Sequence, residues 1–268
     1  MKKWIDLTLD NKKKDINDRF EYTNKVMNID QETALNQFQF DSFKKNKTYF
    51  SQYNYFKDRL SNNTLFLASG YGFYEFFLKG TFKNFLCSDS EEKYINFNHK
   101  NRLSNFIKFD ATNKDDIGKI NFTPQNIVLN NVEYLFDDNE LTGCLENIHT
   151  LSDENTKVYI IFRSRYYYLI DFFYKFLIPA EFLLKKVILQ IFGKKKYINS
   201  NFHGFLRKKK DFEKILKKRF IIKNLYKDLY SLNYERSLII NKLKLGKIFS
   251  LIFFKLHPYL HIYELRIK

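Results

Sequence analysis

Cysteine, proline and glycine are scarce in this sequence, and each scarcity excludes a class of protein. The 268 residues contain 2 Cys, 3 Pro and 8 Gly. Cys87 and Cys144 cannot form a disulfide framework, and neither lies at a spacing typical of metal ligands. So few turn residues also argue against an all-β sandwich, which needs many tight turns. The sequence therefore predicts a reducing, cytoplasmic setting and no metal site.

A leader sequence and a long uninterrupted apolar run are also missing. The first residues, MKKWIDLTLDNKKKD, carry charges on both sides of a short apolar run and offer no small-residue cleavage site, which is unlike a signal peptide. The most apolar stretch, 166–192, is interrupted by five charged side chains. A transmembrane helix needs about 20 mostly apolar residues. We therefore expect a cytoplasmic protein, with peripheral attachment to the inner face of the membrane as an open alternative.

Positive charge is abundant, and it gathers at one end of the chain. The formal net charge is +16, yet residues 1–160 carry 21 basic and 23 acidic side chains, whereas 161–268 carry 25 basic and 7 acidic ones. A codon bias toward lysine acts on a whole chain and does not explain this asymmetry. The distribution predicts a local basic surface that faces a polyanion or an anionic membrane.

Five short apolar runs alternate with helical stretches in the middle of the sequence. The runs are TLFLAS, FKNFLCSD, NFIKFDAT, NIVLNN and KVYIIFRS, between residues 64 and 164. Such alternation predicts βαβ units and a doubly wound, mostly parallel sheet. Two later runs, IIKNLYKDLY and HIYELRIK, bring the expected number of strands to seven. Residues 31–60 have aromatic side chains at helical spacing and predict a helix ahead of the sheet.

Small and polar residues follow four of these predicted strands. They are the turn 69–72 after the first strand, Asp89 and Asp110 after the second and third, and Asn130 and Asn131 after the fourth. Ligands of open α/β sheets bind at the carboxyl ends of the strands. The sequence therefore places a ligand site at this edge.

The turn Ala68-Ser69-Gly70-Tyr71-Gly72 has small residues at alternating positions, which lets the backbone bend sharply and lets a ligand approach it. A dinucleotide fingerprint would need a third glycine three residues after Gly72, and that position is Glu75. The pattern thus argues against a nicotinamide-dinucleotide site.

With this turn and these acids in this order, the chain resembles the class I S-adenosylmethionine-dependent methyltransferases, in their small-molecule, lipid or glycan branch. The resemblance is good over residues 60–165 and looser over 200–268. It implies a Rossmann-like seven-stranded sheet and S-adenosylmethionine as cofactor. Phe66 and Ala68 stand where the family usually carries an acid and its first glycine.

The resemblance also implies roles for individual residues. Asp89 would bind the ribose hydroxyls and Asp110 would lie near the adenine amino group. His203, the histidine nearest the expected acceptor, is the candidate general base, and Tyr134 and Arg163 are candidates to line the acceptor site. The full set of implied cofactor-binding residues is Ala68, Ser69, Gly70, Gly72, Asp89, Ser90, Asp110, Ala111 and Asn130.

These observations lead to one expected function and two alternatives. We expect a methyltransferase acting on a small, glycan- or lipid-linked acceptor, with 1–60 as a helical extension or lid, 61–165 as the cofactor-binding core, 166–210 as an apolar-basic helical insertion and 211–268 completing the sheet. An RNA methyltransferase that uses the basic C-terminal part is the first alternative. A catalytically degenerate binding or scaffold protein of the same fold is the second.

Overall fold

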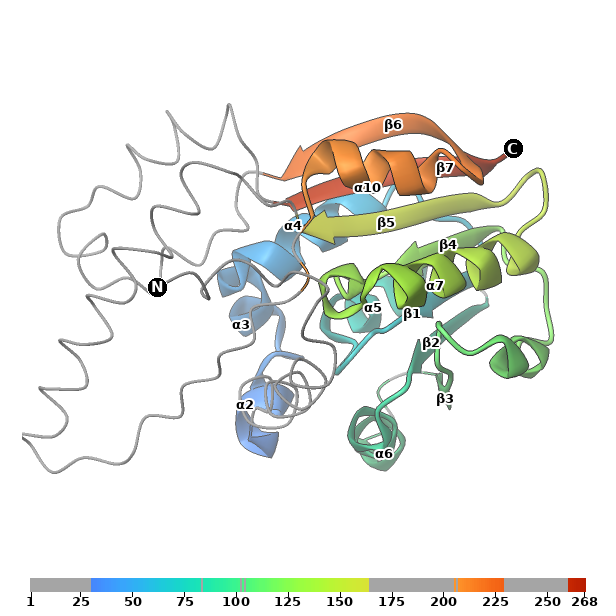
Figure 1. The fold of residues 1–268 in the computed structure, drawn as a ribbon. Helices are drawn as coiled ribbons and strands as arrows, with labels where there is room; N and C mark the ends of the chain where they lie inside the picture. Colours follow the sequence, from blue (N-terminus) through green and yellow to red (C-terminus); the bar gives the residue numbers. More distant parts are fainter. Residues whose placement is uncertain are drawn as a thin grey trace, which may run out of the picture.

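The computed structural model describes residues 30–82, 84–101, 103, 105–163, 205, 207–228 and 260–268 (Figure 1). They form a seven-stranded sheet of order β3-β2-β1-β4-β5-β7-β6. The five strands from β3 to β5 are parallel, and β7 is antiparallel to both of its neighbours. This confirms the predicted mostly parallel, seven-stranded sheet. The strands are β1 Thr64–Leu67, β2 Phe85–Asp89, β3 Phe106–Lys108, β4 Asn126–Leu129, β5 Lys157–Arg163, β6 Phe220–Asp228 and β7 Leu260–Ile267.

Among the described residues, the helices lie where the sequence predicts them, with one difference. The single helix expected over 31–60 is divided into three: Asn46 ends one helix and begins the next, and its side chain accepts a hydrogen bond from the Tyr49 amide, as an N-cap asparagine does. The α-helices are α2 Gln31–Asn36, α3 Phe40–Lys45, α4 Lys47–Phe56, α5 Phe73–Leu78, α6 Glu92–Asn101, α7 Asp138–Leu151 and α10 Lys209–Leu216.

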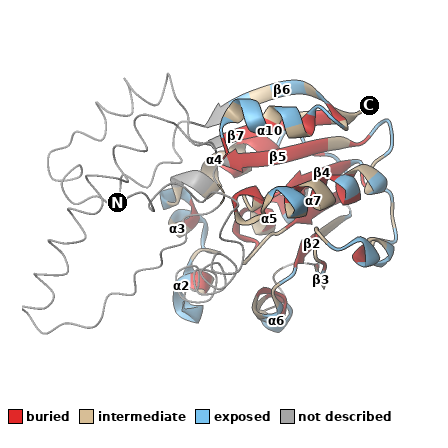
Figure 2. Cartoon of the chain, viewed as in Figure 1, coloured by how far each residue is buried: buried red, intermediate tan, exposed pale blue. Residues whose placement is uncertain are grey.

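Helices cover both faces of the sheet, because its central strands are apolar on both sides (Figure 2). Successive side chains of a strand point to opposite faces. Leu65 and Leu67 therefore pack in one core with α7 and α10, while Phe66 packs in the other with α3, α4 and α5. This confirms the doubly wound arrangement.

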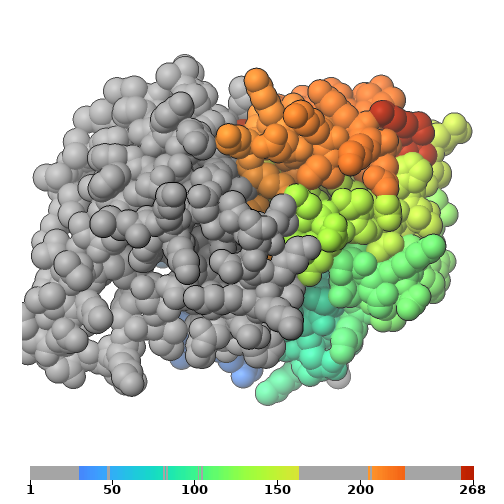
Figure 3. All heavy atoms as spheres, viewed as in Figure 1, coloured from blue at the N-terminus to red at the C-terminus, as the bar shows by residue number. Residues whose placement is uncertain are grey.

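The first core continues to the antiparallel edge of the sheet. Phe212 of α10 stacks on Phe162 of β5, with ring centroids 4.0 Å apart, and also contacts Tyr263 of β7. In the space-filling view, residues 207–228 lie on the surface directly beside α7 (Figure 3). The C-terminal strands and α10 therefore belong to the same body as the parallel strands.

The predicted domain limits remain predictions. Residues 1–29 of the expected extension and 164–204 of the expected insertion lie outside the described residues. Within the described part of the chain, no helix is both long enough and apolar enough to cross a bilayer.

Candidate functional site

The turn after β1 has a left-handed backbone at three positions. Ala68, Gly70 and Gly72 have φ angles of 56°, 57° and 70°. A Cβ at Gly72 would lie 3.0 Å from the Phe106 ring, whereas a Cβ at Gly70 would meet no atom within 4 Å. Gly72 thus allows the close packing of β3, and Gly70 leaves open space above the turn. An open backbone surface of this kind lets a ligand lie against the chain.

Ala68 is the one of these three positions that bears a side chain, and its conformation leads to a stability prediction. The left-handed conformation costs an L-residue about 1–2 kcal/mol, and glycine would remove this strain. Ordering a glycine on folding costs about 0.5–1 kcal/mol more than ordering an alanine, which offsets part of the gain in stability. We expect Ala68→Gly to raise the free energy of unfolding by about 0.5–1 kcal/mol, and Tm by about 1–4 °C, in thermal unfolding followed by circular dichroism. The same change at helical Ala34, buried in α2, should lower Tm. A lower Tm for Ala68→Gly would contradict the expected strain.

Asp89, the last residue of β2, reaches across to this turn. Its Oδ2 accepts a hydrogen bond from the Gly70 amide at 2.8 Å, and its Oδ1 accepts one from the Glu91 amide at 3.0 Å. Burial raises the pKa of Asp89 to about 6, against the lowering effect of these two hydrogen bonds. A carboxylate has about four acceptor sites. Two backbone contacts therefore leave Asp89 with capacity for two ligand hydroxyls.

The loop after β3 is held by polar contacts of its own. Oδ1 of Asp110 accepts hydrogen bonds from the amide and the hydroxyl of Thr112, both at 2.8 Å. The Asp110 amide donates to Asp116, and the Ala111 carbonyl accepts from Asn147 of α7. At least part of the Asp110 carboxyl thus has a structural role that the sequence did not reveal. The contacts fix the loop beside Asp89, whose carbonyl accepts from the Phe109 amide.

A polar cluster joins the turn after β1 to the end of β4. The Asn130 amide group donates to Glu75 and, at 3.5 Å, to the Ser69 hydroxyl, while the Tyr74 hydroxyl donates to Asn130 Oδ1. The order of strands reverses between β1 and β4, because the chain builds outward from β1 in one direction and from β4 in the other. Such a reversal is where α/β sheets bind ligands. Sequence reasoning used Glu75 only to exclude a dinucleotide site. An acid inside the apolar stretch FYEFFL was the available signal.

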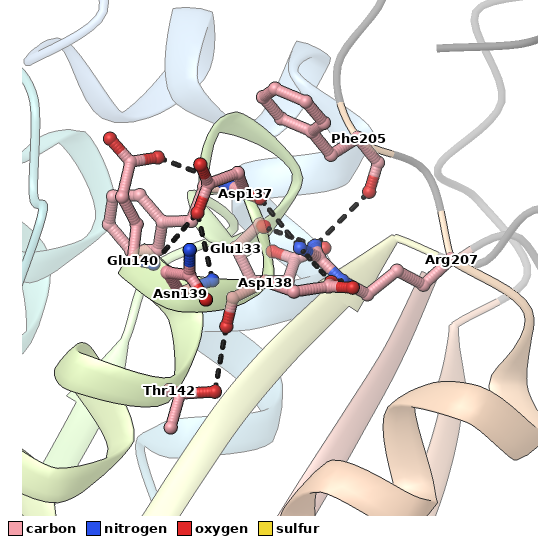
Figure 4. A network of polar contacts seen from close by, with 9 residues as sticks. Glu133, Asp137, Asp138, Asn139, Glu140, Thr142, Phe205 and Arg207 are labelled. Carbon is pink, nitrogen blue, oxygen red and sulfur yellow. Dashed lines mark hydrogen bonds and ion pairs between the residues drawn. The ribbon is translucent and has the colours of Figure 1, made fainter. Parts of the chain in front are cut away.

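A second group that the sequence did not single out is Arg207, just before α10 (Figure 4). Its side chain is 9% exposed, and its guanidinium forms an ion pair with Asp138 at 2.8 Å. It also donates to the backbone carbonyls of Glu133, Phe136 and Phe205. An arginine with this many short contacts is strongly oriented. Arg207 thereby fastens the chain that enters α10 to the loop after β4, which carries Tyr134.

The structure describes only some of the remaining predicted site residues. Ser90 is exposed directly after β2, and Tyr134 is buried in the loop after β4. The backbone carbonyl of Tyr134 accepts from the Phe205 amide. His203 and the side chain of Arg163 lie outside the described residues. The structure therefore brings together the turn 68–72, Asp89 and Asn130, and the roles of Tyr134, Arg163 and His203 stay predictions.

Comparisons with known proteins give matches by structure alone. No family model and no curated protein matches the sequence. The magnesium protoporphyrin IX methyltransferase of Synechocystis, solved with bound S-adenosylhomocysteine, matches at 13% identity over 83% of this chain and 82% of that one, with a TM-score of 0.50. A Pyrococcus horikoshii protein matches at 16% identity over 80% and 85%, with a TM-score of 0.48. An S-adenosylmethionine-dependent methyltransferase of Clostridium acetobutylicum matches at 12% over 92% and 96%, with a TM-score of 0.46. At 13% identity, the likeness to the Synechocystis protein shows a shared fold alone.

Proposed function

We propose that this chain, whose fold is that of the class I S-adenosylmethionine-dependent methyltransferases, binds S-adenosylmethionine and transfers its methyl group to a small, glycan- or lipid-linked acceptor. One observation carries the proposal. The Asp89 carboxyl, at the end of β2, is held at 2.8 Å from the Gly70 amide of the turn after β1. A carboxylate and an open glycine turn thus face the same edge of the sheet, beside the strand reversal where ligands of such sheets bind.

The residues at this edge fit an S-adenosyl nucleoside. Asp89 would accept hydrogen bonds from the ribose hydroxyls, and the loop of Asp110 and Ala111 would lie by the adenine. The open backbone at Gly70 would receive the amino-acid part, next to Ser69 and Asn130. The family's usual acid two residues ahead of the turn is absent, since Phe66 occupies its position inside the core.

Methyl transfer requires the protein mainly to position the acceptor and the methyl group. S-adenosylmethionine, when bound, supplies a methyl group on a positively charged sulfur that is already a good leaving group. The protein's task is to hold an acceptor in line with that methyl group and to exclude water, a proximity effect of about 7–11 kcal/mol at most. A general base is needed only where the acceptor must lose a proton, and His203 is the candidate.

The surface charge suggests two classes of acceptor. Lysine and arginine side chains cluster around α10, at Lys208, Lys209, Lys210, Lys214, Lys217, Lys218 and Arg219. Such a surface suits an anionic membrane face or an acidic glycan. It would also suit RNA, the second candidate, for which phosphate contacts make binding fall steeply with salt. We propose a cytoplasmic location, at or near the inner membrane face.

Isothermal titration of the full-length protein with S-adenosylmethionine tests the proposal. We expect a single site with a dissociation constant of roughly 1 μM to 1 mM, the range of ordinary enzyme substrates. NAD serves as the control ligand and should not bind, since Glu75 replaces the third glycine of its fingerprint. Absence of S-adenosylmethionine binding would overturn both methyltransferase hypotheses. It would leave a catalytically degenerate binding or scaffold protein as the remaining hypothesis.

The acceptor class needs a separate measurement. Sedimentation with anionic phosphatidylglycerol vesicles and with RNA, each at two salt concentrations, separates the two candidates. Binding to vesicles without binding to RNA supports the lipid- or glycan-linked acceptor. Steeply salt-dependent RNA binding without vesicle binding would favour the RNA methyltransferase instead.

A further inference from the structure

Glu75 is a buried carboxyl group to which neither the fold nor the resemblance assigns a role. It lies on α5, one turn after Gly72, and its side chain is 1% exposed. Burying a carboxyl group costs free energy unless it is hydrogen-bonded, and burying its ionised form costs several kcal/mol unless a cation or a set of hydrogen bonds compensates. A surface helix therefore does not place a glutamate inward without a partner.

The partners that Glu75 has are polar but uncharged. It accepts a hydrogen bond from the Asn130 amide group and another from the Ser69 hydroxyl. None of the ion pairs among the described residues includes it. Two titratable groups act on it electrostatically: the Asp89 carboxyl group of β2 and the Tyr74 hydroxyl group of its own helix. Neither of them is a cation. Among the described residues, Glu75 thus has hydrogen-bond donors that orient its carboxyl group but no cation that would stabilise its ionised form.

Glu75 lies at the strand reversal between β1 and β4. Ser69 lies in the turn after β1 and Asn130 directly after β4, so both of its partners lie at the strand reversal. On the same face of the sheet, the strand position that could have carried an acid is Phe66, packed against Tyr74 with ring centroids 6.1 Å apart. The helix α5, rather than the strand β1, therefore brings the carboxyl group to this place.

We propose that Glu75 binds the positively charged part of S-adenosylmethionine, its ammonium or its sulfonium group, and is oriented for this contact by Ser69 and Asn130. This inference rests on the proposed function above. It makes Glu75 a cofactor-binding residue, and it assigns to a helix the carboxylate that the first strand lacks.

The contact has a consequence that can be measured without a variant. Burial raises the pKa of Glu75 to about 8, so in the free protein the carboxyl is mostly protonated at pH 7. A cation bound beside it favours the ionised form, and the proton leaves to the buffer. Binding at pH 7 should therefore release close to one proton. Asp89, with a pKa of about 6, is already largely ionised at that pH and contributes little.

Titration calorimetry at pH 7.0 in two buffers of different ionisation enthalpy, phosphate and Tris, measures this release. For the unchanged protein we expect nearly one proton per bound S-adenosylmethionine. For Glu75→Gln we expect almost none, together with an affinity lower by about 30-fold or more, as for the loss of one member of a buried charge pair. Glu75→Asp, which keeps the charge on a shorter side chain, should recover part of both effects. Glu154→Gln is the matched control, because Glu154 is exposed in the turn before β5, at the opposite edge of the sheet.

Two ligands distinguish the two cationic groups. S-adenosylhomocysteine keeps the ammonium group and lacks the sulfonium charge. Equal losses of affinity for both ligands in Glu75→Gln indicate the ammonium group, and a loss confined to S-adenosylmethionine indicates the sulfonium. Unchanged affinity for both, or no proton release by the unchanged protein on binding, overturns the role of Glu75 and leaves the proposed function standing. Failure of the unchanged protein to bind S-adenosylmethionine overturns the proposed function, and this role with it.

Discussion

Replacing Asp89 by alanine is expected to lower the affinity for S-adenosylmethionine by about 100-fold or more. The change removes the proposed acceptor of two ribose hydroxyls, and hydrogen bonds to a charged group contribute about 1.5–3 kcal/mol each. It also removes the acceptor that holds the Gly70 amide at 2.8 Å, so the turn loses its attachment to β2. Titration calorimetry measures the affinity, and far-ultraviolet circular dichroism establishes that the variant is folded.

The matched control for this variant is Asp58→Ala. Asp58 is exposed in the connection that leads into the amino end of β1, away from the proposed site. Its replacement should leave the affinity within about twofold, as for a surface change distant from any special contact. A folded Asp89→Ala protein that binds S-adenosylmethionine as tightly as the control would show that the ribose is held elsewhere.

Restoring the acid that the family usually carries on its first strand is expected to unfold this protein rather than improve it. Phe66 is fully buried between Tyr74 and Phe85, so Phe66→Asp removes a large apolar side chain. Such truncations cost about 3–5 kcal/mol. The new carboxylate would also be buried beside apolar groups without a cation, at a further cost of several kcal/mol. The sum is comparable to the total stability of a typical domain, about 5–15 kcal/mol.

Urea unfolding at pH 7 checks this expectation. Phe66→Leu is the comparison variant, because it keeps an apolar side chain and should cost clearly less than Phe66→Asp. A Phe66→Asp protein with nearly unchanged unfolding midpoint would mean that the position is open to solvent or to a cation, contrary to the packing of the second core. Its failure to fold would agree with an acid carried by α5 instead.

The parallel strands could be predicted because their physics is local. The run KVYIIFR is rich in β-branched and aromatic residues and is bounded by turn residues. It therefore predicts the strand β5 without any knowledge of the rest of the fold. The same holds for β2 and its terminal Asp89. The helix expected over 31–60 was divided because its breaks depend on caps such as Asn46, and the aromatic spacing continues through them.

The buried polar groups could not be predicted, because their partners are distant in the sequence. Asn130 lies 55 residues from Glu75, and Arg207 lies 69 residues from Asp138. Nothing in the spacing of FYEFFL says that its glutamate faces inward. That orientation follows only when α5 packs on the face of the sheet that carries Phe66, and β4 aligns beside β1.

The sequence by itself therefore determined the class of fold, the order of its elements and the edge of the sheet where polar residues gather, since these follow from periodicity and from residues adjacent in the chain. The tertiary structure alone decided which carboxyl groups are buried and what they contact. Burial is a property of packing between elements, and it sets both the raised pKa of Glu75 and the place of Asp89 above the glycine turn.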